Sequence, residues 1–429
     1  MQLPLQMRTR QNETQSPATD LLESNHVSRR KFLLLAATIA AGGLTGACSS
    51  VRQDDFSRNS IIRVPDGLSV ARFPEKEELI MLTDRPPQLE TPQYYYRQDL
   101  TPNEAFFVRW HFSGIPTSVD LRTFKLEVGG HVQKPLSLSL DELRGQFEAV
   151  SIVAVNQCSG NSRSFFAPQV PGGQWGHGAV GNARWTGVRL KDLLRRAGVK
   201  AAAVQVTFAG LDEPPLYTLH KFVKALDIDH AAGEDVIVAY EMNGEPLPLL
   251  NGFPLRLVVP GWYATYWVKS LAKIEVVTSQ FDGFWMAKAY RIPKNANASE
   301  TPENLATDTV PINKMNVRSI LVRPDFTDVV RAGKQFEIEG IAFDGGSGIS
   351  KVEVSVDGGN SWNLAKLDSA DYGNFSFKRW RLSWTPSSAG NHKILTRATS
   401  GDGKTQGLQY WNKSGYMRNG IEQVEVPVV

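Results

Sequence analysis

The chain has 429 residues, of which 41% are hydrophobic and 21% are charged, and its formal net charge is +3. That length allows two or three domains with sizeable cores. The near-neutral charge gives no bulk electrostatic attraction for nucleic acid, so we expect no nucleic-acid partner.

Residues 1–48 are predicted to be an export signal. After a polar stretch, the run Ser-Arg-Arg-Lys-Phe-Leu at 28–33 leads into an apolar segment that ends near Leu44. A basic start and a short apolar segment are typical of a signal peptide. The paired arginines resemble a twin-arginine signal, which directs the export of folded proteins. A chance basic pair before a buried helix is the alternative. We therefore expect a periplasmic protein.

The sequence contains two cysteines, Cys48 and Cys158. Cys48 closes a Leu-Thr-Gly-Ala-Cys run that resembles a lipoprotein box imperfectly, because Leu44 is one position too far back. Lipidation of Cys48, which would give a lipid anchor, and simple cleavage nearby are both open. The folded protein then keeps effectively one thiol. In an oxidising compartment a single retained cysteine is either a small buried hydrophobe or a functional thiolate.

Residues 49–90 are predicted to form an extended lead-in, punctuated by proline and charged residues. The next segment, 91–312, has the signals of a mixed α+β domain. A capped start at Ser139 and the apolar spacing of 190–197 predict helices. Apolar alternation and short apolar runs predict strands. The expected strands cover residues 106–108, 124–128, 151–155, 204–209, 236–240 and 254–260.

Cys158 follows the predicted strand 151–155 and precedes a long loop, 159–184, that is rich in glycine, proline and asparagine. Loops of that length inside a compact domain are usually functional. Gly160 would allow a sharp turn or the close approach of a bulky group. Arg163, five residues beyond the sulfur, would favour the thiolate, which is a soft metal ligand or a nucleophile. An inert buried cysteine at a strand end is the alternative.

Helix signals disappear in the last part of the chain, residues 313–429. Apolar residues alternate with polar ones at 336–340, 352–356 and 380–384, and an Asp-Gly-Gly turn follows the second run. Short alternating strands with regular turn signals predict an Ig-like β-sandwich.

Three further places carry side chains suited to binding an anion or a cofactor. Arg109 and His111 lie at the end of a predicted strand, and arginine offers a fixed fork of donors for oxyanions. Arg256 ends the run Gly-Phe-Pro-Leu-Arg, and Tyr290 is a phenol that could donate a hydrogen bond. A surface arginine, a packed histidine and a half-buried tyrosine are the ordinary alternatives. The sequence shows no covalent-haem motif, iron–sulfur cysteine array, dinucleotide fingerprint or zinc spacing.

Several motifs, in order along the chain, resemble one family. Asn-Gln-Cys-Ser-Gly-Asn-Ser-Arg at 156–163 looks like the cysteine motif of the sulfite oxidase family, and the segments 175–185 and 240–261 are similar to its later segments. The resemblance runs from about residue 90 to the C-terminus. It is nearest to the bacterial exported branch, the molybdenum subunits of sulfite:cytochrome c oxidoreductases. It implies a molybdopterin-binding domain followed by an Ig-like dimerisation domain, and hence a homodimer.

The resemblance also implies a cofactor and its site. The family holds molybdenum by a pyranopterin dithiolene and one cysteine, and Cys158 matches that metal ligand. By position, the residues of the anion pocket are Arg109, Arg163, Trp175 and Tyr290. The residues that match positions holding the pterin are His111, Arg256 and Lys269.

Two positions depart from the animal members of that family. Asn251 stands where they have a histidine, which puts one pterin contact in doubt. Gln423 matches the place of a pocket arginine that they bring from near the C-terminus, so we expect a less cationic pocket. We expect no haem domain in this chain.

The activity implied by the resemblance is oxidation of sulfite to sulfate. Arg109 and Arg163 would bind the sulfite oxygens and turn its sulfur toward the metal, while Tyr290 would tune proton and electron movement. Without a second redox centre, electrons would leave singly to a separate carrier such as a c-type cytochrome. Sulfane dehydrogenase, sulfoxide reductase and nitrate reductase activities are rivals on the same scaffold. A non-catalytic exported binding protein is the alternative from a different class.

Overall fold

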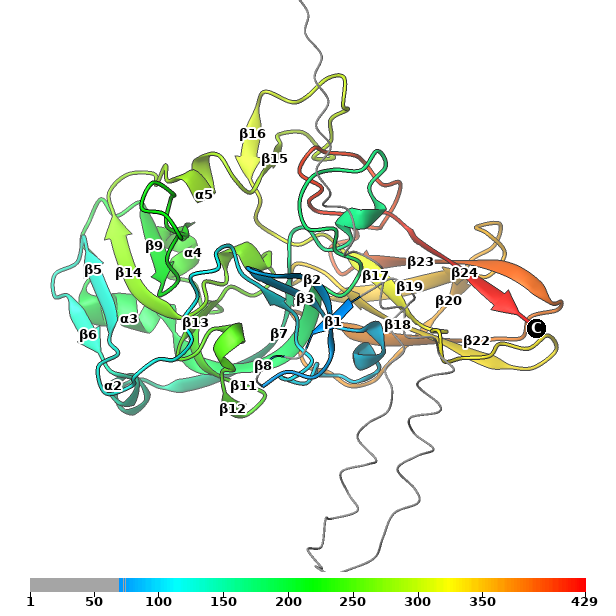
Figure 1. The fold of residues 1–429 in the computed structure, drawn as a ribbon, viewed down its shortest axis with the longest axis horizontal. Coiled ribbons are helices and arrows are strands. Elements are labelled where there is room, and N and C mark those ends of the chain that lie inside the picture. The colour runs from blue at the N-terminus through cyan, green and yellow to red at the C-terminus, as the bar shows by residue number, and fades with distance from the viewer. Residues whose placement is uncertain (1–68, 72, 74) are drawn as a thin grey trace, which may run out of the picture. The chain divides into compact units, whose positions relative to one another are not determined.

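The computed structural model describes residues 69–71, 73 and 75–429. The predicted export signal and Cys48 lie outside the described residues, so the statements about them stay predictions. Within the described part of the chain, no helix is long and apolar enough to cross a membrane. Figure 1 shows the order of the elements along the chain.

An antiparallel sheet occupies part of the segment predicted as a lead-in. Its strands, which pair in chain order, are β1 (Ser69–Ala71), β2 (Leu79–Asp84), β3 (Pro87–Glu90) and β4 (Val108–Arg109). Leu79 and Leu89 pack with Val108 and Trp110 in a small core. A 3-10 helix, η1 (Gln93–Arg97), follows β3. Because β4 ends at Arg109, this sheet positions the first of the predicted anion-binding residues.

Two five-stranded sheets form the main body of the α+β domain (Figure 1). One has the order β10-β9-β14-β5-β6, with β14 parallel to β5, and the other has the order β12-β11-β8-β7, with β13 paired to β11. The strands of the first are β5 (Leu126–Gly130), β6 (Leu136–Leu138), β9 (Gln205–Gly210), β10 (Val223–Asp227) and β14 (Leu271–Val277). The strands of the second are β7 (Ala149–Gln157), β8 (Val180–Arg189), β11 (Ile237–Met242), β12 (Glu245–Pro246) and β13 (Arg256–Val258).

The helices of this domain are short. The helix predicted to begin after Ser139 is α2 (Leu140–Gln146). Its capping box is present, because the Ser139 hydroxyl accepts from the Glu142 amide and the Glu142 carboxylate accepts from the Ser139 amide. The helix predicted over 190–197 is α3 (Leu190–Ala197), which buries its leucines against β5 and β8. The remaining helices are α4 (Ile228–Ala231), α5 (Phe284–Ala287), η2 (Arg163–Phe165), η3 (Leu249–Asn251) and η4 (Ala264–Tyr266).

The loop after Cys158 is shorter than the predicted 159–184. Residues 180–184 belong to β8, where Val180 pairs with Gln157 and Arg184 pairs with Val153 of β7. Glycine and asparagine in this stretch suggested a turn, but pairing with the buried strand β7 outweighs their local preference. The loop therefore covers residues 158–179.

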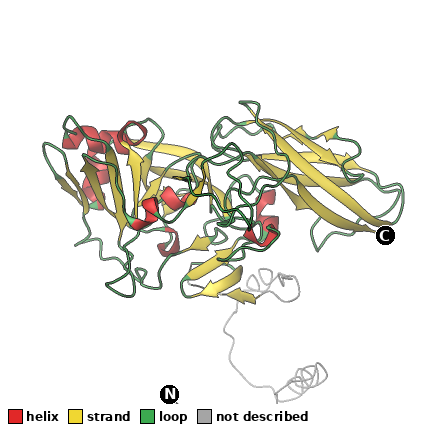
Figure 2. Ribbon diagram, turned by 90° about the horizontal axis from the view of Figure 1, so that it is seen from above, coloured by secondary structure: helices red, strands yellow, loops and turns green. Residues whose placement is uncertain are grey.

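The last part of the chain is a β-sandwich, as predicted, with a short hairpin before it. The hairpin consists of β15 (Arg291–Pro293) and β16 (Thr309–Pro311). One sheet of the sandwich has the order β17 (Arg318–Arg323), β18 (Phe336–Phe343), β22 (Lys378–Trp384) and β21 (Lys366–Leu367). The other has the order β20 (Asn363–Leu364), β19 (Ile349–Ser355), β23 (Gly390–Ser400) and β24 (Glu422–Val428). Figure 2 shows the sandwich as strands and loops. Its core contains Ile338, Val352, Val354 and Trp380, at the alternating positions that predicted it.

Candidate active site

A cavity in the α+β domain brings six of the eight predicted site residues together. Its empty volume is about 480 Å³, counted out to the solvent at its mouth. The six residues that line it are Arg109, His111, Cys158, Arg256, Lys269 and Tyr290.

Cys158 is held at this cavity by the end of β7. Its backbone amide donates to the Ala179 carbonyl at 2.9 Å, and its carbonyl accepts from the Asn161 amide at 3.0 Å. The Asn161 side chain in turn accepts from the Ala179 amide at 3.0 Å. The cysteine is 8% exposed and is the free thiol of the described residues. The strand and these three bonds fix the thiol at the cavity wall.

In the described part of the chain, the lining of the cavity contains positively charged side chains and no carboxylate. Among the described residues that line it, none is an aspartate or a glutamate, whereas Arg109, Arg256 and Lys269 are all present. Burial, together with the charge of the neighbouring Arg256, lowers the pKa of Lys269 to about 7, while Asp212 acts in the opposite direction. Burial also lowers the pKa of Arg256 to about 9. A bound anion would relieve the cost of holding these cations together.

Several polar atoms at the cavity have no hydrogen-bond partner within the described protein. They are Arg109 Nη1, Asn156 Nδ2, Ser159 Oγ, Arg256 Nε and Thr265 Oγ1. A buried donor left unpaired costs about 1–3 kcal/mol, so such groups usually face a ligand or water. The cavity therefore suits an anionic ligand with many hydrogen-bond acceptors, placed beside a thiol.

His111 and Tyr290 form one hydrogen-bonded pair, with 2.6 Å between His111 Nε2 and the Tyr290 hydroxyl. Burial holds the pKa of His111 well below its usual value, and the charges of Arg109 and Lys269 act in the same direction. Burial raises the pKa of Tyr290 above its usual value. The imidazole and the phenol are therefore both uncharged at neutral pH.

Arg163 and Trp175 do not line this cavity but lie in the loop that starts at Cys158. Arg163 is 8% exposed; its Nε donates to the Ser414 carbonyl and its Nη1 to the Gly173 carbonyl, each at 3.2 Å. No carboxylate in the described chain pairs with it. A Cβ atom on Gly160 would lie 2.6 Å from Arg163 Nη2, so the close approach predicted for Gly160 is that of this guanidinium. Trp175 is buried, and its carbonyl accepts from the Ser164 amide at 3.1 Å.

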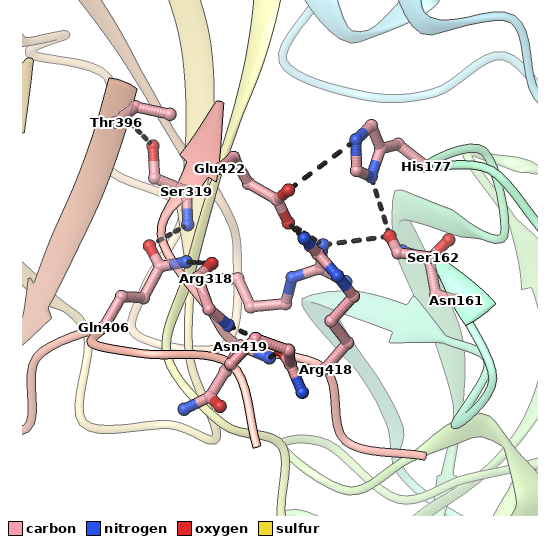
Figure 3. A network of polar contacts seen from close by, with 12 residues as sticks. Asn161, Ser162, His177, Arg318, Ser319, Thr396, Gln406, Arg418, Asn419 and Glu422 are labelled. Atoms are coloured by element: carbon pink, nitrogen blue, oxygen red, sulfur yellow. Dashed lines mark hydrogen bonds and ion pairs between the residues drawn. The ribbon is translucent and has the colours of Figure 1, made fainter. Parts of the chain in front are cut away.

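A buried polar network joins this loop to the sandwich (Figure 3). The Ser162 hydroxyl lies 2.7 Å from His177 Nδ1 and accepts from Arg318 Nη2 at 3.0 Å. The same guanidinium donates to Glu422 Oε1 at 2.6 Å, and Arg418 pairs with that carboxylate too. Arg318 and Glu422 are 0% and 4% exposed. Ser162 precedes Arg163, so the network anchors the start of η2 to the second domain.

One expectation from the sequence needs revision, and a second residue that the sequence singled out lies at the cavity. Gln423 does not replace a pocket arginine: it is exposed on β24, pairs with Leu395 of β23 and does not line the cavity. Alternation along β24 turns Glu422 inward and Gln423 outward. Asn251 does line the cavity, and its side chain accepts from Lys76 Nζ and donates to the Phe107 carbonyl at 3.1 Å. Lys76 lies in the predicted lead-in, and no sequence signal indicated it.

Comparison with known proteins agrees with the fold and with the cavity. A model of the oxidoreductase molybdopterin-binding domain matches residues 112–285, and a model of the Mo-co oxidoreductase dimerisation domain matches residues 309–428. Mitochondrial sulfite oxidase of Homo sapiens is 34% identical over 362 residues, which cover 80% of this chain and 63% of that protein. Nitrate reductase [NADH] 1 of Oryza sativa subsp. japonica is 30% identical over 395 residues, 85% of this chain and 42% of that protein.

Among solved structures, the sulfane dehydrogenase SoxCD from Paracoccus pantotrophus shares the fold, with a TM-score of 0.69. It is 24% identical, and the match covers 80% of this chain and 85% of that chain. The fold and the cavity thus define a molybdopterin oxidoreductase. More narrowly, the chain belongs to the sulfite oxidase family of molybdopterin enzymes. It spans about 63% of the length of the animal sulfite oxidases that it matches.

The predicted family, α+β fold and molybdenum–molybdopterin cofactor are therefore confirmed. The cavity fits that cofactor, because its lining includes a thiol that could bind the metal and hydrogen-bond donors that have no partner in the described protein. The described lining also contains cationic side chains and no carboxylate. The role of each individual site residue stays a prediction.

Proposed function

We propose that the protein oxidises sulfite to sulfate and passes the electrons to an external one-electron acceptor such as a c-type cytochrome. The observation that carries this proposal is a cavity lined by both a thiol and Arg109, with no carboxylate among its described lining residues. The similarity to mitochondrial sulfite oxidase over 80% of the chain supports the same substrate.

Cys158 would hold the molybdenum, and His111, Arg256 and Lys269 would hold the pterin. The unpaired Arg256 Nε and the buried Lys269 are suited to the acceptor-rich, anionic part of that cofactor. When bound, the cofactor supplies the two-electron oxidation and the transfer of an oxygen atom.

The protein's own contribution is to bind and orient the anion. Arg109 and Arg163 lack carboxylate partners in the described chain, so their guanidinium groups are available to the oxygens of sulfite. Charge-assisted hydrogen bonds of this kind contribute about 1.5–3 kcal/mol each. Holding two oxygens fixes the direction of the sulfur lone pair, which is a positioning effect.

The Tyr290–His111 pair can handle a proton at the same place. Oxidation of sulfite adds an oxygen from water and releases two electrons and two protons. Both groups are uncharged, so the contact of 2.6 Å has two forms: the phenol donates its proton to His111 Nε2, or Nε2–H donates to the phenol oxygen and leaves the phenol proton for a hydrogen bond into the pocket.

The partners and location belong to the same proposal. A twin-arginine signal in residues 1–48 would deliver the folded protein to the periplasm, where a c-type cytochrome is a suitable acceptor. The match of residues 309–428 to a dimerisation domain supports a homodimer. Lipidation of Cys48 remains a separate prediction from the sequence.

The test uses protein purified from a host that makes the cofactor, with molybdenum quantified on the same sample. We expect sulfite-dependent reduction of cytochrome c, and we expect Cys158→Ser to abolish it while circular dichroism and the unfolding midpoint stay close to wild type. Sulfane sulfur, methionine sulfoxide and nitrate are the competing substrates. Full activity in Cys158→Ser contradicts the ligand assignment; molybdenum-loaded protein that ignores sulfite but turns over another substrate contradicts the proposed reaction. Absence of molybdenum favours the non-catalytic alternative.

A further inference from the structure

A segment of the second domain, residues 411–417, crosses to the loop that begins at Cys158. At one end, Trp411 Nε1 donates to the Pro168 carbonyl at 2.8 Å. At the other end, the Met417 amide donates to the Ser159 carbonyl at 3.1 Å, one residue after the predicted metal ligand. The segment belongs to the connection between β23 and β24, so the sandwich places it here.

The segment has its own internal framework. Asn412, which is 2% exposed, donates to the Tyr416 carbonyl at 3.0 Å, and its side-chain oxygen accepts from the Tyr416 amide at 3.2 Å. Gly415 has a φ of 58°, and a Cβ atom there would lie 2.8 Å from Arg163 Cγ and 2.5 Å from Val170 Cγ2. A glycine is therefore required for this turn to close against Arg163.

The consequence of this framework is the position of the Tyr416 ring. It is parallel to the ring of Tyr290, with 5.4 Å between centroids and 4° between planes. The Arg163 Cζ atom lies 5.2 Å from the centre of the Tyr416 ring. Tyr416 thus touches one residue predicted to bind the substrate anion and one predicted to move its proton. Burial raises its pKa, although Arg163 and Arg109 oppose that rise, so the phenol is uncharged at neutral pH.

We infer that Tyr416 is a further positioning residue of the anion pocket, supplied by the second domain. It acts through Arg163, whose guanidinium lies over its ring face, and its stacking against Tyr290 keeps the ring in that place. The Ser414 carbonyl, from the same segment, accepts a hydrogen bond from Arg163 Nε and fixes the direction of the guanidinium. The inference rests on the proposed function for the identity of the anion and for the place of Arg163 in the anion pocket.

The experiment uses the full-length holoprotein and two measurements, the dissociation constant of sulfate by calorimetry and the steady-state constants for sulfite. Sulfate is the probe because it is the product oxyanion and is not consumed. The variants are Tyr416→Leu, which removes the flat ring, and Tyr416→Phe, which keeps it. Tyr410→Leu is the matched control, since Tyr410 is an exposed tyrosine of the same connection.

Losing the ring should weaken anion binding because Arg163 is no longer held. For Tyr416→Leu we expect the sulfate dissociation constant and the sulfite KM to rise roughly tenfold, as loss of a partly desolvated cation–π contact implies. The kcat and the molybdenum content should stay within about twofold of wild type. Tyr416→Phe should restore both constants to within about threefold, and Tyr410→Leu should change neither. A purely structural role would lower kcat, molybdenum content and stability together.

Unchanged sulfate binding in Tyr416→Leu would overturn the inference whether or not the wild type oxidises sulfite. If the wild type fails to oxidise sulfite but the tenfold change in sulfate affinity is found, the proposed function fails and the inference stands. If the leucine variant does not fold, Tyr416→Met keeps the apolar volume without the flat face. That variant must then show the same tenfold change, and wild-type affinity in it would refute the role of the ring.

Discussion

Neutralising Glu422 tests the polar network between the sandwich and the loop after Cys158. In the Glu422→Gln variant, Arg318 and Arg418 would keep their buried positions without the carboxylate that pairs with both. Burial alone would raise the pKa of Glu422, but the positive groups around it lower that pKa to about 2. His177 is the first of these positive groups, but burial lowers its own pKa to about 4, so at pH 7 it is uncharged and the two arginines supply the positive charge.

The size of the effect follows from that pKa. One pKa unit corresponds to about 1.4 kcal/mol, so the fall from 4.5 to about 2, which includes the charge that His177 carries only at low pH, gives an upper value of about 3 kcal/mol for the stabilisation by the ionised carboxylate. Removing one partner of a buried ion pair typically costs about 3–5 kcal/mol. The two figures agree, and we expect Glu422→Gln to lower the free energy of unfolding at pH 7 by about 3 kcal/mol.

The assay is urea unfolding followed by tryptophan fluorescence, at several pH values. Because the folded pKa of Glu422 lies below the unfolded one, its contribution is complete above about pH 4.5 and is lost as the pH falls toward 2. The gap between variant and wild type should therefore be constant from pH 7 to 5 and narrow below that. Glu337→Gln is the control, since Glu337 is 43% exposed and lies 3.7 Å from Arg381; it should cost less than about 1 kcal/mol. A loss below 1 kcal/mol for Glu422→Gln would refute the reasoning.

Two other variants test separate parts of the site. Burial raises the pKa of Glu90 to about 7, although the Gly176 and Gly178 amides oppose that rise. Because the folded pKa exceeds the unfolded one, the protein loses stability as the pH rises through 7 and this carboxyl ionises. At pH values above 7, Glu90→Gln should therefore raise the thermal unfolding midpoint by an amount equivalent to about 2–3 kcal/mol. An unchanged midpoint at pH 8 would contradict this. Arg109→Gln should raise the sulfite KM about 10- to 100-fold, because one charge-assisted contact is lost, and steady-state kinetics showing an unchanged KM would exclude a substrate contact at Arg109.

Local sequence signals were sufficient to predict the helices and strands whose formation depends on residues close together in the chain. The capping box at Ser139 and the apolar spacing of α3 require only residues within one or two helical turns. The alternation in β19 and β22 predicted which residues the sandwich buries, because a strand repeats every two residues. The place of Cys158 at the end of β7 followed from the same kind of local pattern.

The parts that escaped prediction depend on contacts between distant residues. Lys76 bonds to Asn251, 175 positions further along the chain, and no periodicity in either segment indicates that contact. The error at Gln423 has a related cause: a shift of one residue along a strand moves a side chain to the opposite face. The sequence around 411–417 has many polar and glycine residues, which marks a loop but not the place where that loop meets Arg163.

Many of these long-range contacts join the same two parts of the chain, the sandwich and the loop after Cys158. Arg318 and Glu422 hold Ser162 from one side, while the segment 411–417 bonds to Pro168, Gly415 closes against Arg163 and Met417 bonds to Ser159. Both sets contact the stretch that carries Arg163, whose guanidinium has no carboxylate partner in the described chain. A buried cation of this kind keeps its direction only if its surroundings are rigid. Under the proposed function, the sandwich would supply one wall of the anion pocket, and we expect mutations there to change substrate binding as well as stability.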